Sequence, residues 1–422
     1  MQNLPKGARG CSAFTHKSYN MIFMFVCLLV VHTTYGASTP PTFTLDLSLP
    51  PPERWRGALA ASTFGRSWNE TFGPIFQFHN ESLYDQVDEA MFTTLGNAMR
   101  THYPIESLEL DTIVHEFNVL FPEQYVSFNY LAGWVYFHEL AHTDLASNSS
   151  VWRECTGLLA QSADGSMHHV ANMDQSPPAV RNVTLHVRFV NGSTARKPLF
   201  EGVDWYWFTT GTSRMVLPGV VSVQENWRFS QLSHKAVLQD IQAGVVPQIY
   251  VFRRSLERVA AMNPPITFDE MVDEWSNTRL AAPFYIVMAG AKSGEGAVIA
   301  RNKTGVAAPN GVLRMDSGQW YLVQTNYDHW RKDDKNDPRR TAAETLLEEF
   351  GAKAGSSDLG LFAVSGTFPV HNPHTAYTAV MSARDGTLLP FVRVSMSCVR
   401  CIQLQHFMTL SIVYLVIKKG EG

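Results

Sequence analysis

The chain has 422 residues, of which 45% are hydrophobic and 17% are charged, as in globular proteins and unlike disordered ones. Its formal net charge is -4, so it lacks the basic surplus that neutralises phosphates, and we expect no nucleic-acid partner. The length suffices for one large domain or two modest ones.

Residues 1–36 are predicted to be a signal peptide with an N-terminal extension. The apolar run at residues 22–31 is too short to cross a bilayer, Lys17 precedes it, and the small residues Gly36 and Ala37 suit a cleavage zone. A buried hydrophobic helix is the alternative interpretation. Export through the secretory pathway would place the mature protein in the lysosome or outside the cell.

Asn-x-Ser/Thr sequons agree with export, because this tripeptide is the acceptor for N-glycosylation in secreted proteins. A single sequon arises easily by chance, whereas several behind a signal peptide carry more weight. We predict glycosylation at the sequons of the chain, which are Asn69, Asn80, Asn148, Asn182, Asn191 and Asn302.

The five cysteines point to one candidate nucleophile. Cys11 and Cys27 lie in the segment expected to be removed, and Cys398 and Cys401 lie in an atypical C-terminal tail. Cys155 is therefore alone in the body of the chain, which excludes a disulfide framework there. A solitary cysteine in a secreted or lysosomal enzyme is a candidate nucleophile, and a small buried hydrophobic residue is the alternative.

Residues 37–154 are predicted to be mainly helical. Apolar residues recur at helical spacing from Leu83 to Met99, and a second helical stretch covers roughly residues 131–145. The composition changes after this segment, so we place a boundary before Cys155.

Residues 155–396 are predicted to carry the strands. Apolar and polar residues alternate over 184–190, and Asn191-Gly192 marks the turn that follows. Later come a helix near 230–245 and strands at 284–288, 296–300 and 320–324. Strands and helices grouped in this way indicate a layered α+β architecture.

The tail at residues 397–422 does not resemble the rest of the chain. Its apolar run at 407–417 is too short for a full membrane span. A weak membrane anchor and a buried strand both stay open as interpretations.

Cys155 opens a strand-like run that Asp164-Gly165 turns back toward Asp174. A carboxylate there would hold the α-amine of a cysteine placed at a chain terminus. A thiol is a weak nucleophile until a base removes its proton, and a free α-amine, with a pKa of roughly 7.7–8.0, is suited to that task. This interpretation requires cleavage between Glu154 and Cys155, and a mature heterodimer of the two chains so produced.

Three separated blocks of the sequence resemble the family of acid ceramidase and N-acylethanolamine-hydrolysing acid amidase. This family belongs with the choloylglycine hydrolases among the N-terminal-nucleophile hydrolases. The blocks are CTGLLAQSADG at 155–165 with NMDQ at 172–175, PFYIVMAGAKSGEGAVIARN at 283–302, and VQTNYDHW at 323–330 with DPRRT at 337–341. The resemblance covers roughly residues 40–395.

The resemblance implies a four-layer αββα sandwich, with residues 37–154 as a helical N-terminal subunit and residues 155–396 as the catalytic subunit. It implies hydrolysis of the non-peptide C–N bond of lipid amides, either N-acylethanolamines or ceramide, without a cofactor or a metal. Such substrates imply peripheral contact with a membrane or a lipid micelle.

Residue by residue, the resemblance makes Cys155 the nucleophile and base, and makes Asp174 the group that orients its amine. Asn326 matches the oxyanion-hole asparagine of the family, and Arg339 matches a supporting arginine. An amide N–H aimed at developing oxyanion charge typically contributes about 2.7–4 kcal/mol. Taken singly, Asn326 could belong to a turn and Arg339 to a solvated pair of arginines.

The sequence departs from the family pattern at two positions. Ala171 stands where the family usually has an arginine, and a cation there would lower the pKa of the thiol. We expect Arg339 to reach the same space; otherwise the thiol keeps a pKa near its usual value of about 8.5. Trp227 stands where the family has a glutamate, and Glu225 lies nearby. An inactive lipid-binding glycoprotein of the same fold is therefore one alternative.

The segment from His138 to His142 matches the HExxH pattern of zinc proteases. On a helix, both histidines would share a face and could bind zinc, with Glu139 as the general base. The pattern fixes only three positions, and no third ligand is evident in the sequence. The alternative is that these residues cap and solvate a helix packed near the cleavage site.

Overall fold

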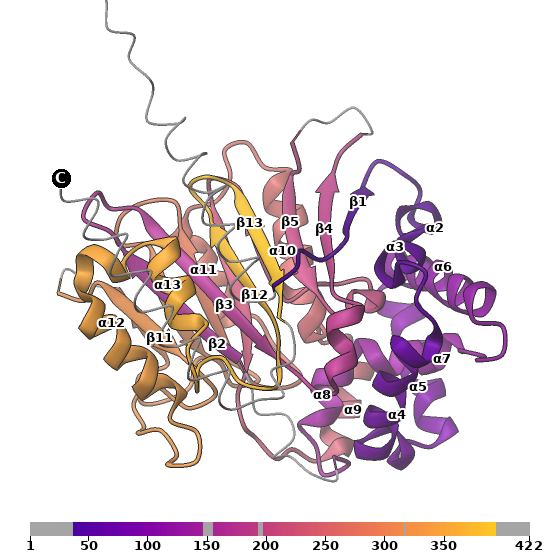
Figure 1. Ribbon diagram of the computed structural model, residues 1–422. Coiled ribbons are helices and arrows are strands. Elements are labelled where there is room, and N and C mark those ends of the chain that lie inside the picture. The colour runs from indigo at the N-terminus through magenta and orange to yellow at the C-terminus, as the bar shows by residue number, and fades with distance from the viewer. Residues whose placement is uncertain (1–36, 147–154, 193–196, 316–317, 394–422) are drawn as a thin grey trace, which may run out of the picture.

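Two β-sheets packed face to face, with helices on both outer sides, form the body of the molecule (Figure 1). The computed structural model describes residues 37–146, 155–192, 197–315 and 318–393. The predicted signal peptide, the sequon at Asn148, the cleavage residue Glu154 and the C-terminal tail lie outside the described residues.

The smaller sheet has five antiparallel strands in the order β11-β2-β3-β12-β13. Its centre is the hairpin of β2 and β3, in which Cys155 pairs with Met173, so the predicted hairpin is confirmed. The Asp164 carboxylate accepts hydrogen bonds from Ser162 and Ser166, and Gly165 takes a positive φ of 80° that favours glycine. The strands are β2 (Cys155–Gln161), β3 (Met167–Asp174), β11 (Tyr321–Gln324), β12 (Thr375–Ser382) and β13 (Thr387–Val392).

The larger sheet has eight strands in the order β1-β4-β5-β6-β7-β8-β9-β10. All neighbours are antiparallel except β1 and β4, which pair in parallel and so join the N-terminal segment to the later strands. The strands are β1 (Thr42–Asp46), β4 (Leu185–Val190), β5 (Phe200–Asp204), β6 (Arg214–Leu217), β7 (Val221–Trp227), β8 (Phe284–Gly290), β9 (Gly296–Ala300) and β10 (Val312–Arg314).

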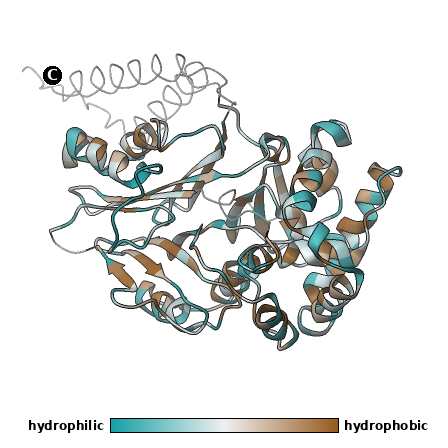
Figure 2. Ribbon diagram, turned by 90° about the horizontal axis from the view of Figure 1, so that it is seen from below, coloured by the Kyte–Doolittle hydropathy of each residue, from teal (hydrophilic) through white to brown (hydrophobic). Residues whose placement is uncertain are grey.

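Helices cover the outer face of each sheet, as Figure 2 shows from a second direction. Leu346 and Leu361, on the helices over the smaller sheet, pack against Leu158 and Val170 of its central hairpin. The predicted α+β class and four-layer αββα order are therefore confirmed. The helices over the smaller sheet are α12 (Arg339–Gly355) and α13 (Asp358–Ser365), and those after β7 are α9 (His234–Gln242), α10 (Gln248–Ala260) and α11 (Phe268–Asn277).

Because both sheets lie between other layers, their strands are buried on both faces. Every residue of β8 and β12 is buried, which explains why β8 is a continuous apolar run instead of an alternating one. The polar side chains of the facing sheets bond to each other: His169 of β3 contacts Ser222 and Gln224 of β7 at 3.0 Å each.

The N-terminal helices pack at one end of the sandwich (Figure 1). The predicted helix from Leu83 to Met99 starts later, at Glu89, because the Asp88 carboxylate accepts a hydrogen bond from the Met91 N–H and caps the helix there. The predicted helix near 131–145 is two shorter ones. These helices are α2 (Pro51–Arg54), α3 (Ala58–Thr63), α4 (Phe72–Ser82), α5 (Glu89–His102), α6 (Pro104–Leu120), α7 (Phe128–Val135) and α8 (Phe137–Ala141).

A buried ion pair fastens the N-terminal helices to the rest of the protein. Glu109 of α6 is fully buried, and its carboxylate accepts hydrogen bonds from both terminal nitrogens of Arg253 of α10, at 2.6 and 2.8 Å. The Trp55 indole donates a further hydrogen bond at 3.0 Å. Among the described residues, no helix is both long enough and apolar enough to cross a membrane.

Replacing Glu109 with alanine should destabilise the protein strongly, because Arg253 would stay buried after losing its main counter-charge. We expect the free energy of unfolding to fall by about 3–5 kcal/mol. The matched control is Asp111→Ala, which removes an equally bidentate but exposed pair with Arg100 and should cost no more than about 1 kcal/mol. Denaturant unfolding of both variants measures the difference, and equal losses would contradict the structural role of Glu109.

Candidate active site

Cys155 begins β2 and is nearly enclosed between the two sheets, with 5% of its surface exposed. Its Sγ accepts a hydrogen bond from Arg214 Nη2 of β6 at 2.8 Å and lies 3.7 Å from Met173 Sδ of β3. Its backbone N–H donates to Asn326 Oδ1 at 3.1 Å. The thiol and the adjoining nitrogen are thus held by residues from three separate parts of the chain.

Arg339 connects the predicted site residues. It is the first residue of α12, and its guanidinium donates to the Cys155 carbonyl oxygen at 3.1 Å, to Asn326 Oδ1 at 2.8 Å and to Asp174 Oδ2 at 3.4 Å. Asp337 accepts two hydrogen bonds from the same group, at 2.6 and 2.7 Å. The four residues predicted from the sequence, Cys155, Asp174, Asn326 and Arg339, therefore lie together.

Asp174 ends β3 beside the start of β2. Its Oδ2 accepts a hydrogen bond from Asn372 at 2.9 Å, while its buried Oδ1 has no hydrogen-bond partner among the described residues. Burial raises the pKa of Asp174, and Arg339, Thr375 and Asn372 oppose this rise. The site therefore offers a buried carboxylate with one acceptor atom still available.

Asn326 follows β11 and is buried in the site. Its Oδ1 is occupied by the Cys155 N–H and by Arg339, and its Nδ2 donates to the Trp227 carbonyl oxygen at 2.9 Å. In the uncut chain, the amide N–H of Asn326 therefore donates to a backbone carbonyl oxygen. The predicted oxyanion role stays a prediction.

The cation beside the thiol is not the one expected from the sequence. Arg339 reaches the Cys155 carbonyl oxygen, whereas Arg214 reaches Sγ, so the expectation that Arg339 fills the space of the missing family arginine is wrong. Burial raises the pKa of the Cys155 thiol to about 12, and Arg214 opposes this rise. Sequence reasoning missed Arg214; the available signal was an arginine at the head of an otherwise apolar strand, RMVL.

The HExxH segment forms α8 and its C-terminal end, and it is buried. Glu139 Oε1 accepts a hydrogen bond from the Gln248 N–H at 2.6 Å, at the first turn of α10, and His142 stacks on Trp227 with ring centroids 3.7 Å apart. Burial lowers the pKa of His138 to about 3, so this histidine is neutral. Among the described residues, no group of three or more His, Cys, Asp or Glu is placed to hold a metal ion. The segment therefore joins α8 to the sheets and to α10.

Glu225, two residues before Trp227, is buried beside α8. Its Oε1 lies 3.6 Å from His138 Nε2 and is otherwise unpartnered, and burial raises the pKa of Glu225 to about 7. The aromatic ring of Trp227 packs over both histidines of α8.

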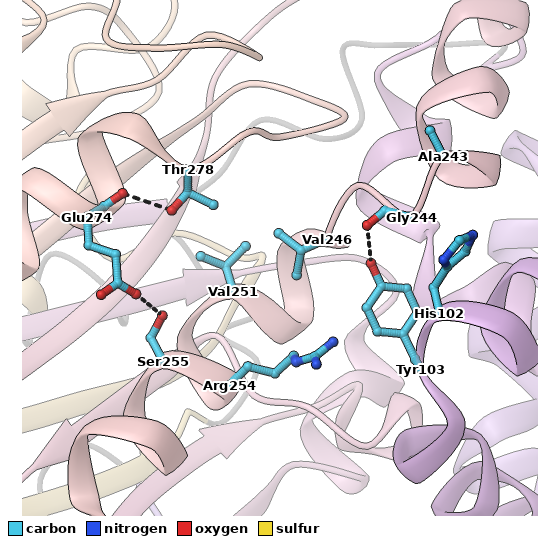
Figure 3. Close-up of a pocket in the computed structure, with 10 residues that line it drawn as sticks. All are labelled: His102, Tyr103, Ala243, Gly244, Val246, Val251, Arg254, Ser255, Glu274 and Thr278. Atoms are coloured by element: carbon cyan, nitrogen blue, oxygen red, sulfur yellow. Dashed lines mark hydrogen bonds between the residues drawn. The ribbon is translucent and has the colours of Figure 1, made fainter. Parts of the chain in front are cut away.

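A cavity of about 310 Å³ lies elsewhere, between the junction of α5 and α6 and the helices α9 to α11 (Figure 3). Tyr103 donates a hydrogen bond to the Gly244 carbonyl oxygen across it, and Ser255 donates to Glu274. The lining contains none of the residues around Cys155, so this cavity is separate from the candidate site.

The sequons differ in exposure. Asn69, Asn191 and Asn302 are exposed, whereas Asn80 and Asn182 are half-buried. Asn182 Nδ2, the atom that would carry a glycan, donates a hydrogen bond to the Glu70 carbonyl oxygen at 2.8 Å. The exposed sequons are therefore the better acceptors.

Known proteins resemble the chain over most of its length, although no family model matches it. The N-acylethanolamine-hydrolyzing acid amidase of Caenorhabditis elegans is 34% identical over 229 residues, and that of Rattus norvegicus is 29% identical over 82% of this chain and 87% of its own length. Acid ceramidase of Heterocephalus glaber is 25% identical over 86% of this chain and 89% of its own length. The chain is thus similar to both proteins, and its similarity to the rat amidase and to this acid ceramidase extends over most of its length.

The match is uneven along the chain. The alignment with the worm relative covers 54% of this chain and 61% of that relative, and the same 61% holds for the mouse amidase. A solved structure of the Caenorhabditis elegans N-acylethanolamine-hydrolyzing acid amidase ortholog is 32% identical, covers 55% of this chain and 93% of its own chain, and has a TM-score of 0.47.

Proposed function

We propose that this protein hydrolyses lipid amides, N-acylethanolamines or ceramide, to a fatty acid and an amine, with Cys155 as an N-terminal nucleophile. The observation that carries the proposal is the placement of Cys155 at the head of a central strand, with Asn326, Asp174 and Arg339 gathered at its amide nitrogen and carbonyl. The names of the related proteins support the substrate class. The reaction requires no cofactor.

Cleavage of the Glu154–Cys155 bond would turn the Cys155 N–H into a free α-amine. This nitrogen already lies 3.1 Å from Asn326 Oδ1, and Asp174 on the neighbouring strand has an unused acceptor. A free α-amine with a pKa of roughly 7.7–8.0 can take the proton of the thiol. The same atom would be amide nitrogen before cleavage and general base afterwards.

In the proposed cycle, Sγ attacks the amide carbonyl carbon of the substrate while the α-amine takes the thiol proton. The tetrahedral intermediate collapses, the C–N bond breaks, and the α-ammonium gives its proton to the leaving amine. Water then attacks the thioester, with the α-amine as base, and releases the fatty acid and the thiol. In such a cycle, Asn326 would have to turn its Nδ2 toward the oxyanion, away from the Trp227 carbonyl.

The two chains left by cleavage would stay together as a heterodimer. The parallel pairing of β1 with β4 and the buried pair of Glu109 with Arg253 both join residues before the cleavage point to residues after it. The stacking of His142 on Trp227 does the same close to the site. The ion pair and the His142 ring are buried, and none of these contacts requires a continuous chain at the cleavage point.

Export and glycosylation belong to the same proposal. The mature protein would lie in the lysosome or outside the cell, with glycans on the exposed sequons Asn69, Asn191 and Asn302. Within the described residues, Cys155 is a free buried thiol.

A lipid substrate requires contact with a membrane or micelle, and we propose a surface formed by Phe64, Val119, Leu120 and Tyr125. Phe64 is 79% exposed, Val119 65% and Tyr125 82%. The edge-to-face contact of Trp68 with Phe121, with centroids 5.3 Å apart, brings the segment after α3 beside the end of α6. Apolar side chains in such numbers at one place are typical of lipid or protein contact sites.

The membrane surface is tested with phosphatidylcholine vesicles. The triple variant Phe64→Asn, Val119→Ser, Tyr125→Ser should lose most vesicle co-flotation, because it removes apolar area that would enter the lipid. The control is Met262→Ser, which removes an exposed apolar side chain after α10. Equal flotation of all three proteins would remove this surface from the proposal.

The cleavage is tested by intact-mass analysis and N-terminal sequencing of secreted protein, treated with glycosidase, before and after acid incubation. We expect two chains, the larger beginning at Cys155, and a Cys155→Ala variant that stays whole because it lacks the nucleophile. Wild-type protein that hydrolyses a fluorogenic fatty amide while remaining one chain would contradict the α-amine mechanism. Protein that is cut but inactive would be the lipid-binding glycoprotein of the same fold.

Asn326→Ala should lower turnover on the same substrate by about a hundredfold or more, because it removes a donor to the oxyanion. Its matched control is Asn172→Ala, since Asn172 is equally buried in β3 but bonds to Ser365 and Val370. Both variants should lose some stability in thermal unfolding, whereas only Asn326→Ala should lose turnover per folded molecule. Similar turnover in the two variants would exclude the proposed role.

A further inference from the structure

The cation beside Cys155 comes from the opposite sheet. Arg214 is fully buried at the start of β6, and it donates to Cys155 Sγ through Nη2 and to Ser213 Oγ through Nη1. Its Nε has no hydrogen-bond partner among the described residues. Asp204 and Glu225 act on it only at longer range, and within the described part of the chain it forms no close ion pair with a carboxylate.

A guanidinium in this position stays charged. Although burial lowers the pKa of Arg214, its neighbours Cys155, Tyr377, Glu225 and Asp204 raise that pKa well above the usual value. An uncompensated buried charge is costly, and the atom in hydrogen-bond contact that can become an anion is Cys155 Sγ. Arg214 is therefore the group that favours a thiolate at Cys155, and it acts against the burial that favours the neutral thiol.

Position 171 explains why the opposite sheet supplies this cation. Ala171 pairs with Gly157 on one side and Ala379 on the other, so small residues line this part of the smaller sheet. The hydrogen bonds of His169 to β7 show that alternate residues of β3, including Ala171 and Met173, face the larger sheet. An arginine at 171 would point into the same interlayer space that Arg214 enters from β6.

We propose that Arg214 is a catalytic residue that stabilises the Cys155 thiolate, in place of the strand arginine that Ala171 lacks, an inference that rests on the proposed nucleophilic role of Cys155. The two positions are alternatives: one arginine between the sheets suffices, and a second would place like charges together in a buried space. On this proposal, Arg214 requires a small side chain at position 171, and Ala171 does not imply that activity is lost.

Other charged groups lie around the thiol, and the experiment must separate their effects on its pKa from the effect of Arg214. Arg339 faces the backbone of Cys155, and Glu225 and Asp174 oppose thiolate formation by their negative charge. The nearest alternative source of positive charge is Arg339, so the test includes it.

The first test measures the alkylation rate of Cys155 by iodoacetamide in uncut secreted protein, read on the Cys155 peptide by mass spectrometry. Arg214→Met should slow alkylation at pH 8 by about tenfold or more and shift the rate–pH profile toward alkaline pH, while Arg214→Lys should retain part of the rate. The control is Arg301→Met, which removes an equally buried guanidinium that follows β9 and donates to the carbonyl oxygens of Gly305 and Thr278. It should lower thermal stability without changing the profile.

The second test exchanges the two positions. Ala171→Arg alone should lower thermal stability and give no faster alkylation, whereas Arg214→Ala combined with Ala171→Arg should recover at least part of the rate lost in Arg214→Ala. An unchanged profile in Arg214→Met, or a shift produced by Arg339→Met alone, would overturn the inference. The readout needs no lipid substrate, so a protein that hydrolyses no fatty amide yet shows these shifts would overturn the proposed function and leave the role of Arg214 intact.

Discussion

Burial of the Cys155 thiol between two sheets is the constraint on which the rest of the site depends. Removal from water favours the neutral thiol and raises its pKa, so a reactive cysteine needs compensating charge and a nearby base. Arg214 brings the charge from β6, and the adjoining nitrogen of Cys155 lies where a base would have to be. The fold thus holds the thiol protonated in the uncut chain and close to the groups that could activate it.

The second organising contact is Arg339, which binds the backbone of Cys155, Asn326 and Asp174 from the first residue of a helix. Three segments far apart in the sequence meet at one guanidinium, and Asp337 fixes its orientation with two hydrogen bonds. A planar group with several fixed donors is suited to such a junction, whereas lysine is not. Arg339 therefore shapes the site, while Arg214 determines the charge at the sulfur.

The HExxH segment illustrates how a motif can match in sequence and serve another purpose. Its glutamate caps the start of α10 and its second histidine stacks on Trp227, so the first group joins α8 to α10 and the second joins it to β7. Trp227, which stands where the family has a glutamate, takes part in this contact, because His142 lies on its indole ring. Two departures from the family pattern, Ala171 and Trp227, are thus each matched by a partner on another element.

The sequence by itself determined the features that depend on residues close together in the chain. The solitary Cys155, the Asp164-Gly165 turn, the hairpin that returns to Asp174 and the α+β layering all follow from local turn chemistry and periodicity, and family motifs located Asn326 and Arg339. The start of α5 at Glu89 was missed because the apolar spacing continues upstream of the Asp88 cap. Only the tertiary structure revealed Arg214 at the thiol, the pairing of Glu109 with Arg253 and the role of Glu139. Each of these contacts joins residues from elements far apart in the sequence. The packing of one element on another determines which side chains meet, and no local sequence pattern contains that information.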